Sequence, residues 1–339
     1  MGITNTIENQ SNTQLLSIGQ DEVTPKCKEL LNTLPKERGW RTPNIYLYQD
    51  FWCQPTEIQA IISMQNHYIA QDTDIIVSTI PKSGTTWLKA LCFAIAKRQL
   101  YPHDRSNHPL LTSNPHELVP FLEYKLFANL GIPDMSSLAR PLLMGTHVPI
   151  GALPDSVRNS GCKIVYMVRN PLDTYVSIWH FLSKLRPNSL GPPISFQEGF
   201  DMYCQGTIGF GPYWDHMLGY WHESLRNPRK VMFLRYEDMK ENTGFHLRKL
   251  ADFLGFPFSP EEEEEGVVEG IVKLCSFEKM KEVDVNKNGK GAIADFDNKN
   301  LFRKGVVGDW VNYFSPTMVE RLTKIMDQKL AASGLSFKI

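Results

Sequence analysis

Residues that could bind and act on a small anion are concentrated between Asp74 and Leu91, in the stretch DIIVSTIPKSGTTWLKAL. A near-continuous apolar run breaks at Pro81, and an apolar pattern with helical spacing resumes at Trp87. Backbone N–H groups at a helix start attract anions, and Gly84 would let the backbone approach an oxyanion closely. The stretch lacks the G-x-x-x-x-G-K-[ST] spacing of the common ATP-binding loop. This pattern alone favours a phosphate-binding loop and an ordinary strand–turn–helix corner about equally.

Further cationic residues follow apolar runs elsewhere in the chain. Arg169 comes directly after the run in VYMVRNP, and Ser177 follows eight residues later. Ligands of open α/β sheets bind outside the carboxyl ends of strands, so Arg169 is well placed to hold a second phosphate, with a surface ion pair as the alternative. Arg303 and Lys304 precede two glycines in FRKGVVGDW, which indicates either a second anion contact or a solvated turn.

The predicted site differs from that of an enzyme that uses nucleoside triphosphates. Such enzymes hold Mg²⁺ with a loop Ser or Thr and with an Asp after a second strand. Here the second predicted strand ends in Arg169-Asn170-Pro171, where that Asp would stand. We therefore expect fixed cations, and no metal, at this site. Trp87, Tyr236 and Phe277 could stack on a nucleobase, although core packing is the commoner use of aromatic residues.

The elements that must position these residues alternate along the chain. Apolar runs predict buried strands in 74–80, 162–171 and 230–239, and helical spacing predicts helices in 55–69, 172–185 and 245–256 and after the loop. This alternation predicts an α/β fold with a mostly parallel central sheet flanked by helices. We expect a disordered leader over residues 1–25 and one domain over 26–339, because no linker divides the chain.

Two helix starts are predicted from capping patterns. Thr56 is the expected cap of the helix in 55–69, and Ser259 is expected to cap a helix that begins at Pro260 in SPEEEEEGVVEGIVKL. The five glutamates after Pro260 suit the positive end of a helix dipole. A metal-binding cluster is the alternative, but consecutive residues point around a helix and cannot converge on one ion.

Composition is that of an ordinary globular protein. The chain of 339 residues is 42% hydrophobic and 22% charged, and its net charge of −1 indicates neither nucleic acid nor an anionic membrane as a partner. No apolar run is long enough for a membrane span. Six scattered cysteines without a C-x-x-C pair are typical of reduced thiols in a cytoplasmic protein. Gly2 and Thr6 match the short N-myristoylation pattern, which also occurs by accident.

Taken together, the motifs resemble those of the cytosolic sulfotransferases. The matching phrases, which span about residues 40 to 320, are TIPKSGTTWLKAL, GTHVP, VYMVRNPLDTYVSIWHF, FLRYEDMKENTGFHLRKLADFLG, CSFEKM and FRKGVVGDW. PHELVPFLEY and NIYLYQDFW resemble the plant branch of that family. The resemblance implies a single domain related to nucleotide kinases and 3′-phosphoadenosine 5′-phosphosulfate (PAPS) as the sulfuryl donor.

The resemblance also implies a role for each matched residue. The 5′-phosphosulfate end would lie on Lys82, Ser83, Gly84, Thr85, Thr86 and Trp87, and the 3′-phosphate on Arg169, Ser177, Arg303, Lys304 and Gly305. Trp87, Tyr236, Cys275 and Phe277 would line the adenine. His147 in GTHVP would be the catalytic base, Lys82 would stabilise the leaving oxygen, and Ser177 would hold Lys82 aside until the acceptor arrives.

The chain departs from the family pattern at three places. Gly145 stands where some relatives have a lysine, so Lys82 would stabilise charge alone. Cys275 replaces a common threonine. Of the family's dimerisation motif after G-D-W only Glu320 remains, and Pro316 falls within the stretch, so we expect a monomer or a weak dimer.

The acceptor is expected to be a small hydroxylated molecule in a mostly apolar pocket. Candidate lining residues are Phe51, Trp52, Tyr124, Phe127 and His180. Aromatic content favours a phenolic or flavonoid acceptor, and steroids, hydroxyjasmonates and desulfoglucosinolates are further classes in the plant branch. The alternative functions are a magnesium-dependent nucleotide or nucleoside kinase, and a relative that binds a nucleotide or hormone without turnover.

Overall fold

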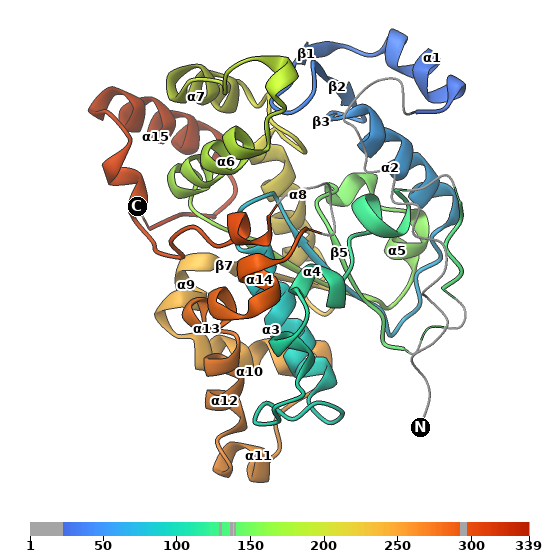
Figure 1. Ribbon diagram of the computed structural model, residues 1–339, viewed down its shortest axis with the longest axis vertical. Helices are drawn as coiled ribbons and strands as arrows, with labels where there is room; N and C mark the ends of the chain where they lie inside the picture. Colours follow the sequence, from blue (N-terminus) through green and yellow to red (C-terminus); the bar gives the residue numbers. More distant parts are fainter. Residues whose placement is uncertain (1–22, 129–130, 136–137, 139, 292–296, 339) are drawn as a thin grey trace.

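The computed structural model describes residues 23–128, 131–135, 138, 140–291 and 297–338 (Figure 1). Gly2, Thr6 and most of the expected leader lie outside these residues. Within the last three positions of that leader, Val23 is buried and the Thr24 hydroxyl accepts a hydrogen bond from the backbone N–H of Cys27. This bond caps the first described helix, α1 (Pro25–Thr33).

A four-stranded parallel sheet forms the centre of the fold. Its strands are β4 (Ile75–Thr79), β5 (Leu143–Thr146), β6 (Lys163–Val168) and β7 (Val231–Arg235). They lie in the order β5-β4-β6-β7, so the chain turns to opposite sides of β4 to make β5 and then β6. This confirms the predicted α/β class. Strand β5 was not predicted, because its apolar run is short and contains Gly145 and Thr146.

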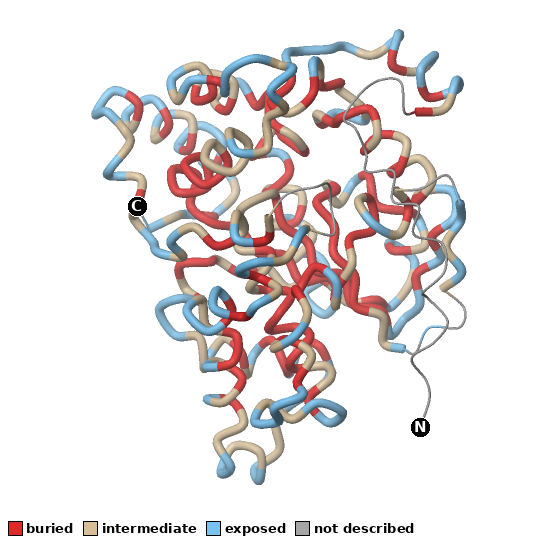
Figure 2. The backbone as a smooth tube through the Cα atoms, viewed as in Figure 1, coloured by how far each residue is buried: buried red, intermediate tan, exposed pale blue. Residues whose placement is uncertain are grey.

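Each face of the sheet carries its own hydrophobic cluster, because side chains alternate along a strand. On β6, Ile164 and Tyr166 join one cluster, whereas Val165 and Met167 join the other. Helices that cover the first face are α2 (Pro55–His67), α6 (Pro171–Leu185) and α8 (Tyr213–Arg226). Helices that cover the second face are α3 (Thr85–Lys97), α10 (Thr243–Leu254) and α12 (Val267–Leu274). Figure 2 shows the resulting buried centre beneath an exposed periphery.

Three helices start directly at the carboxyl ends of three strands. Gly84 is the N-cap of α3 after β4. Asn170 caps α6 after β6, where its side chain accepts from the backbone N–H of Asp173 and Pro171 takes the first helical position. Helix α9 (Tyr236–Glu241) follows β7 without a gap. The segments predicted to bind phosphates are thereby brought to one edge of the sheet.

Of the two predicted caps, one is confirmed and one is wrong. Helix α2 is capped by Gln54 rather than Thr56, because Pro55 takes the first helical position and the Glu57 carboxylate accepts from the Gln54 backbone N–H at 2.8 Å. Ser259 caps α11 (Pro260–Glu264) as expected. The helix ends with the acidic stretch and does not continue beyond it, because Gly266 has a φ of 71° and separates α11 from α12.

Smaller elements surround this centre. A three-stranded antiparallel sheet is made by β1 (Lys36–Arg38), β2 (Asn44–Tyr48) and β3 (Phe51–Cys53). The further helices are α4 (Pro115–Leu118), α5 (Asp155–Asn159), α7 (Phe196–Gln205), α13 (Phe277–Glu282), α14 (Asp284–Asn288) and α15 (Pro316–Leu330). Among the described residues, none of the helices combines the length and the hydrophobicity needed to cross a bilayer.

Candidate active site

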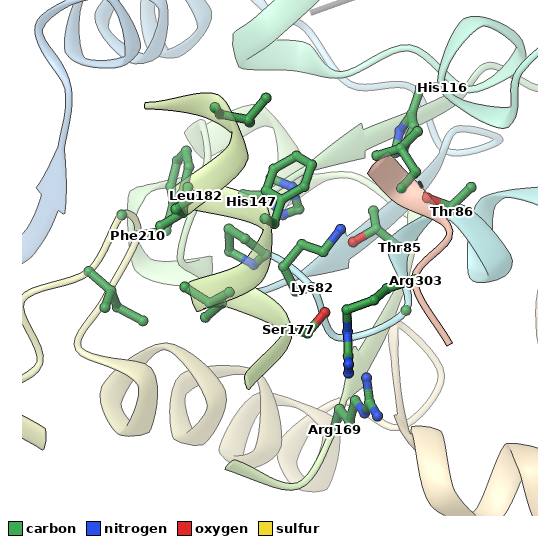
Figure 3. Close-up of a pocket in the computed structure, with 18 of the residues that line it drawn as sticks. Lys82, Thr85, Thr86, His116, His147, Arg169, Ser177, Leu182, Phe210 and Arg303 are labelled. Carbon is green, nitrogen blue, oxygen red and sulfur yellow. Dashed lines mark hydrogen bonds between the residues drawn. The ribbon is translucent and has the colours of Figure 1, made fainter. Parts of the chain in front are cut away.

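One cavity opens at the carboxyl ends of β4, β6 and β7 (Figure 3). It lies where the strand order reverses, the usual ligand position in open α/β sheets. The predicted residues that line it are Lys82, Gly84, Thr85, Thr86, Trp87, Tyr124, His147, Arg169, Ser177, Tyr236, Phe277, Arg303, Lys304 and Gly305. Segments as far apart in the sequence as the first strand–helix corner and residues 303–305 therefore form one site.

Other predicted residues do not line this cavity. Ser83 and Cys275 are fully buried, and the Ser83 hydroxyl has no hydrogen-bond partner among the described residues. The predicted acceptor-pocket residues outside its wall are Phe51, Trp52, Phe127 and His180. Phe51 and Phe127 are buried in the core, where Phe51 stacks on Phe210 with 6.4 Å between ring centroids. Residue type alone could not distinguish the aromatic side chains that pack in the core from those that line the pocket.

The loop before α3 leaves a helix N-terminus open to the cavity. Gly84 has a φ of 101°, and a Cβ atom there would lie 2.5 Å from Met167 Cε and 2.8 Å from a Tyr236 ring carbon. The loop can take this path only with glycine. Gly84 provides no side chain to cap α3, so the first N–H groups of the helix remain available to an anion.

Lys82 lies in a strongly positive environment. Burial and then the nearby charges of Arg169, Arg303 and Lys184 lower its pKa from 10.5 to about 7. Its Nζ atom lies 3.9 Å from the centroid of the Phe181 ring. Like charges gathered at a cavity wall repel each other, and a bound anion would relieve that repulsion. The cluster is therefore suited to a multiply charged anion.

A second group of cations, Arg169, Arg303 and Lys304, lines the same cavity. The Arg169 guanidinium donates to the backbone oxygen of Val306 at 2.6 Å and lies 3.2 Å from Asp173 Oδ2, while its Nε–H is buried without a partner among the described residues. Arg303 and Lys304 both donate to Asp309, at 2.5 and 2.7 Å. These bonds hold the cations in place. In the view of Figure 3, the Ser177 hydroxyl lies between Lys82 and the side chains of Arg169 and Arg303.

The pKa of Asp309 reflects its close pairing with Arg303 and Lys304. Burial alone would raise the pKa of Asp309, but hydrogen bonds from Lys304 and Arg303 lower it to about 2. The carboxylate therefore stays ionised at every physiological pH. Asp309 therefore holds the two cations in position before any ligand arrives.

His147 follows β5 and turns one ring nitrogen to the cavity. Its Nδ1 atom lies 2.7 Å from the backbone oxygen of Thr79. A carbonyl oxygen only accepts, so Nδ1 carries the hydrogen and Nε2 keeps its lone pair. Burial lowers the pKa of His147 to about 3, although the bond to Thr79 opposes that shift. The ring is therefore a neutral imidazole with a free basic nitrogen.

A buried carboxylate that was not predicted from the sequence holds the backbone at His147 in place. Glu123 accepts from the backbone N–H of His147 at 2.7 Å and from the Thr146 hydroxyl at 3.0 Å. Burial raises the pKa of Glu123 to about 7. The residue belongs to the phrase PHELVPFLEY, and its role could not be read there because its partners lie more than 20 residues away in the sequence.

The far end of the cavity is mostly apolar with one polar anchor. The Tyr124 hydroxyl donates to Glu57 Oε1 at 2.5 Å, and an Arg41 nitrogen lies 3.6 Å from the same oxygen. Apolar lining residues here are Ile45, Phe121, Ile178, Phe181, Leu182, Leu185 and Phe210. The cavity thus joins a cationic end to an apolar end, with Lys82 and His147 between them (Figure 3).

No metal-binding group of three or more His, Cys, Asp or Glu side chains occurs within the described part of the chain. The six cysteines all lie in that part and are free thiols. The groups that can hold a ligand here are the cations, the open helix N-terminus and the aromatic rings. Trp87 and Tyr236 meet edge to face with 5.5 Å between ring centroids and flank the cationic end.

Comparison with known proteins relates the whole chain to one family. Residues 72–334 match the family model described as the sulfotransferase domain. Cytosolic sulfotransferase 15 of Arabidopsis thaliana is 52% identical over 338 residues, covering 96% of this chain and 94% of that protein. Cytosolic sulfotransferase 14 of the same plant is 54% identical over 329 residues, covering 95% and 94%.

Solved structures give the same result. A candidate steroid sulphotransferase from Arabidopsis thaliana is 39% identical, with a TM-score of 0.75 and coverage of 95% of this chain and 98% of that one. Mouse sulfotransferase SULT7A1, solved in complex with PAP, is 26% identical, with a TM-score of 0.65 and coverage of 85% and 95%.

Proposed function

The chain belongs to the sulfotransferase family, and we propose that it transfers the sulfuryl group of PAPS to a hydroxyl of a small, mostly apolar acceptor. The observation that carries this proposal is the placement of Lys82 and a neutral His147 between the cationic end and the apolar end of one cavity. A donor with two phosphate positions fits the cationic end, and an uncharged acceptor fits the other.

The donor would be held at three places. Its 5′-phosphosulfate end would lie on the open N-terminus of α3, beside Lys82 and the threonine hydroxyls. Its 3′-phosphate would bind Arg169, Ser177 and the segment Arg303–Gly305. Its adenine would lie between Trp87, Tyr236 and Phe277, three aromatic side chains that line the same wall. The complex of the mouse relative with PAP, the product left after transfer, supports this donor class.

The reaction follows from the proton states of two side chains. The acceptor oxygen attacks sulfur in line, a new oxygen–sulfur bond forms, and the bond from sulfur to the bridging phosphate oxygen breaks. Nε2 of His147 accepts the hydroxyl proton, because its Nδ1 hydrogen is already committed to Thr79. The Lys82 ammonium stabilises the negative charge that develops on the bridging oxygen. The cations of the cavity and the open N-terminus of α3 supply the charge stabilisation in this scheme.

The acceptor end favours a ring-containing molecule with few polar groups. Its apolar walls remove such a molecule from water, and the pair formed by Tyr124 and Glu57 offers one polar anchor near His147. Our preferred class is a phenol or flavonoid. The steroid class named for the 39% identical Arabidopsis structure, hydroxyjasmonates and desulfoglucosinolates are the further classes to be compared.

An acceptor screen tests the proposal. Purified protein is incubated with PAPS and a panel of phenols, flavonoids, steroids, hydroxyjasmonates and desulfoglucosinolates, and products are detected by the mass increase of one sulfuryl group. Omission of PAPS is the control. Tight binding of PAP without transfer to any acceptor would favour the non-catalytic alternative, and absence of PAP binding would contradict the proposed donor site as well.

A further inference from the structure

A buried lysine that the proposed reaction does not use lies one helical turn beyond the anion-binding loop. Lys89 on α3 has no exposed surface. Its ammonium lies 3.1 Å from the centroid of the Phe121 ring and 3.2 Å from Nδ1 of His116. Among the described residues, no carboxylate forms an ion pair with it. Burial of a lysine without an ion-pair partner is energetically costly, so other contacts or a function must compensate for it.

The neighbouring strand is shaped to leave room for this side chain. A Cβ atom at Gly145 on β5 would lie 2.3 Å from Lys89 Cε and 2.4 Å from its Nζ. Any larger residue at position 145 would therefore displace the lysine end. The glycine and the buried lysine depend on each other, which indicates a built arrangement rather than a trapped side chain.

A chain of hydrogen bonds links Lys89 to the wall of the cavity. His116 Nε2 lies 3.0 Å from the Thr86 hydroxyl oxygen (Figure 3), and both residues line the cavity. An ammonium group only donates, so with Lys89 in its charged form Nδ1 of His116 accepts and Nε2 carries the hydrogen. That hydrogen is donated to Thr86 Oγ1. The Thr86 hydroxyl hydrogen is then directed away from His116.

The charge of Lys89 sets this direction. Burial lowers its pKa well below the usual value, while the nearby Glu123 carboxylate opposes the shift. The face of the Phe121 ring favours the ammonium form, and a nearby anion bound at the start of α3 favours it further. In the reverse arrangement the Thr86 hydroxyl would turn its hydrogen to His116 and only its lone pairs toward the anion.

We infer that Lys89 and His116 are positioning residues that fix the Thr86 hydroxyl as a donor to the 5′-phosphate end of the bound nucleotide. This inference rests on the proposed function, which places that end at the start of α3. Neither Lys89 nor His116 needs to touch the nucleotide. Lys89 acts through His116, and His116 acts through Thr86, so removal of any one of the three removes the same contact.

Ligand truncation tests the inference. Calorimetry measures the affinity of wild type, Lys89→Met, Thr86→Val and the double variant for PAP and for adenosine 3′-monophosphate, which lacks the 5′-phosphate. A lost hydrogen bond to a charged group should weaken PAP by about tenfold in each variant, with little change for the monophosphate and no added loss in the double variant. Gly145→Ala should give the same selective loss, because it displaces the lysine end.

A control variant and the wild-type result distinguish a failure of this inference from a failure of the proposed function. Lys97→Met makes the same substitution at the other end of α3, where the lysine donates to the backbone oxygen of Pro141 at 3.3 Å, and should leave both affinities unchanged. Equal losses for the two ligands in Lys89→Met, or no loss, would overturn the inference while the donor site stands. If wild type binds no PAP, the proposed function and this inference both fail.

The histidine tautomer gives a second readout, which is made on the wild-type protein. In nitrogen-15 NMR spectra of the wild-type complex with PAP, the signals of His116, assigned by their loss in His116→Gln, should show hydrogen on Nε2 and none on Nδ1. A hydrogen on Nδ1 would reverse the direction of these hydrogen bonds and overturn the inference, even if the binding data showed a selective loss of PAP affinity.

Discussion

At the scale of single residues, the site depends on two basic groups whose pKa values are lowered by burial. Burial keeps His147 neutral and brings the pKa of Lys82 to about 7. Glu123, whose carboxylate accepts from the backbone N–H of His147, is a third titratable group with a shifted pKa. Perturbed titratable groups gathered at one cavity are typical of catalytic sites. Their roles can be separated by variants and by pH.

Removal of the imidazole should abolish transfer and preserve the donor site. We expect His147→Ala to lower kcat by about 10²- to 10⁴-fold, because a positioned general base contributes that much. Its affinity for PAP, measured by calorimetry, should stay near that of wild type, since the cations lie on other elements. His67→Ala, which changes an exposed histidine at the end of α2, is the matched control. Lost PAP binding in His147→Ala would count against a role as base.

Lys82 should give the enzyme an alkaline limit. Its lowered pKa means that the free enzyme carries the ammonium below about pH 7 and loses it above. We therefore expect kcat/KM for PAPS to fall as pH rises through about 7. The bound anion favours the ammonium form, so the fall in kcat should come at higher pH. Rates measured from about pH 6 to 9 test this.

The arginine variant provides the control for that profile. Lys82→Arg keeps its charge over the whole range, so its kcat/KM should show no alkaline fall even though its absolute rate is lower. The same fall in wild type and in Lys82→Arg would mean that another group titrates.

Much of the cationic end could be predicted from the sequence, because Lys82, Arg169 and Arg303 lie in short motifs whose residue types indicate anion binding. The residues that sequence reasoning missed are those whose role exists only in three dimensions. Lys89 resembles any lysine on a helix until its contact with His116, 27 positions away, is known. Glu123 likewise depends on a partner 24 positions away. A sequence pattern reports local spacing and contains no record of such pairs.

At the scale of elements, strands and helices were predictable where their periodic pattern was long. The runs around β4, β6 and β7 and the helical patterns of α2, α6 and α10 all correspond to observed elements. The short β5 was missed although it carries His147 at its end, and the break at Gly266 was not foreseen. In both cases a glycine is needed for the local structure. Gly145 on β5 leaves room for the Lys89 side chain, and Gly266 takes a positive φ.

One carboxylate joins the elements that hold the second group of cations. Asp173, fully buried in the first turn of α6, accepts from the backbone N–H groups of Gly308 and Trp310 at 2.8 and 3.0 Å and also pairs with Arg169. Because it ties the start of α6 to the segment that carries Arg303 and Lys304, its loss should release that segment from the cavity wall.

Asp173→Ala should therefore weaken nucleotide binding without touching the nucleotide. We expect a loss of about 3–5 kcal/mol in the free energy of unfolding, because Arg169 is left buried without its partner, and a clear loss of PAP affinity. Urea denaturation and calorimetry measure the two effects. Asp201→Ala, which removes the exposed partner of Arg321, should cost about 1 kcal/mol or less. Unchanged PAP affinity in Asp173→Ala would mean that the segment is held by other contacts.

At the scale of the whole molecule, a near-neutral chain gathers four cationic side chains at one cavity. The net charge is −1, yet Lys82, Arg169, Arg303 and Lys304 all line the same wall. The helices and strands that carry them pack on both faces of the central sheet. The two hydrophobic clusters therefore share their strands, and neither can lose its packing while the other keeps an intact sheet. One domain over residues 26–339 stays a prediction, and unfolding experiments test it.

Calorimetric unfolding should accordingly show one transition, and PAP should raise it as a whole. A ligand that contacts the ends of β4, β6 and β7 and the segment at residues 303–305 stabilises only the state in which all of them are assembled. At 100 times its dissociation constant, PAP should add about 2.7 kcal/mol to the free energy of unfolding. ATP with Mg²⁺ should shift the midpoint less, because it offers no 3′-phosphate to Arg169 and Arg303. Two transitions, or a PAP effect confined to one of two, would show that the chain is divided into separately folding units.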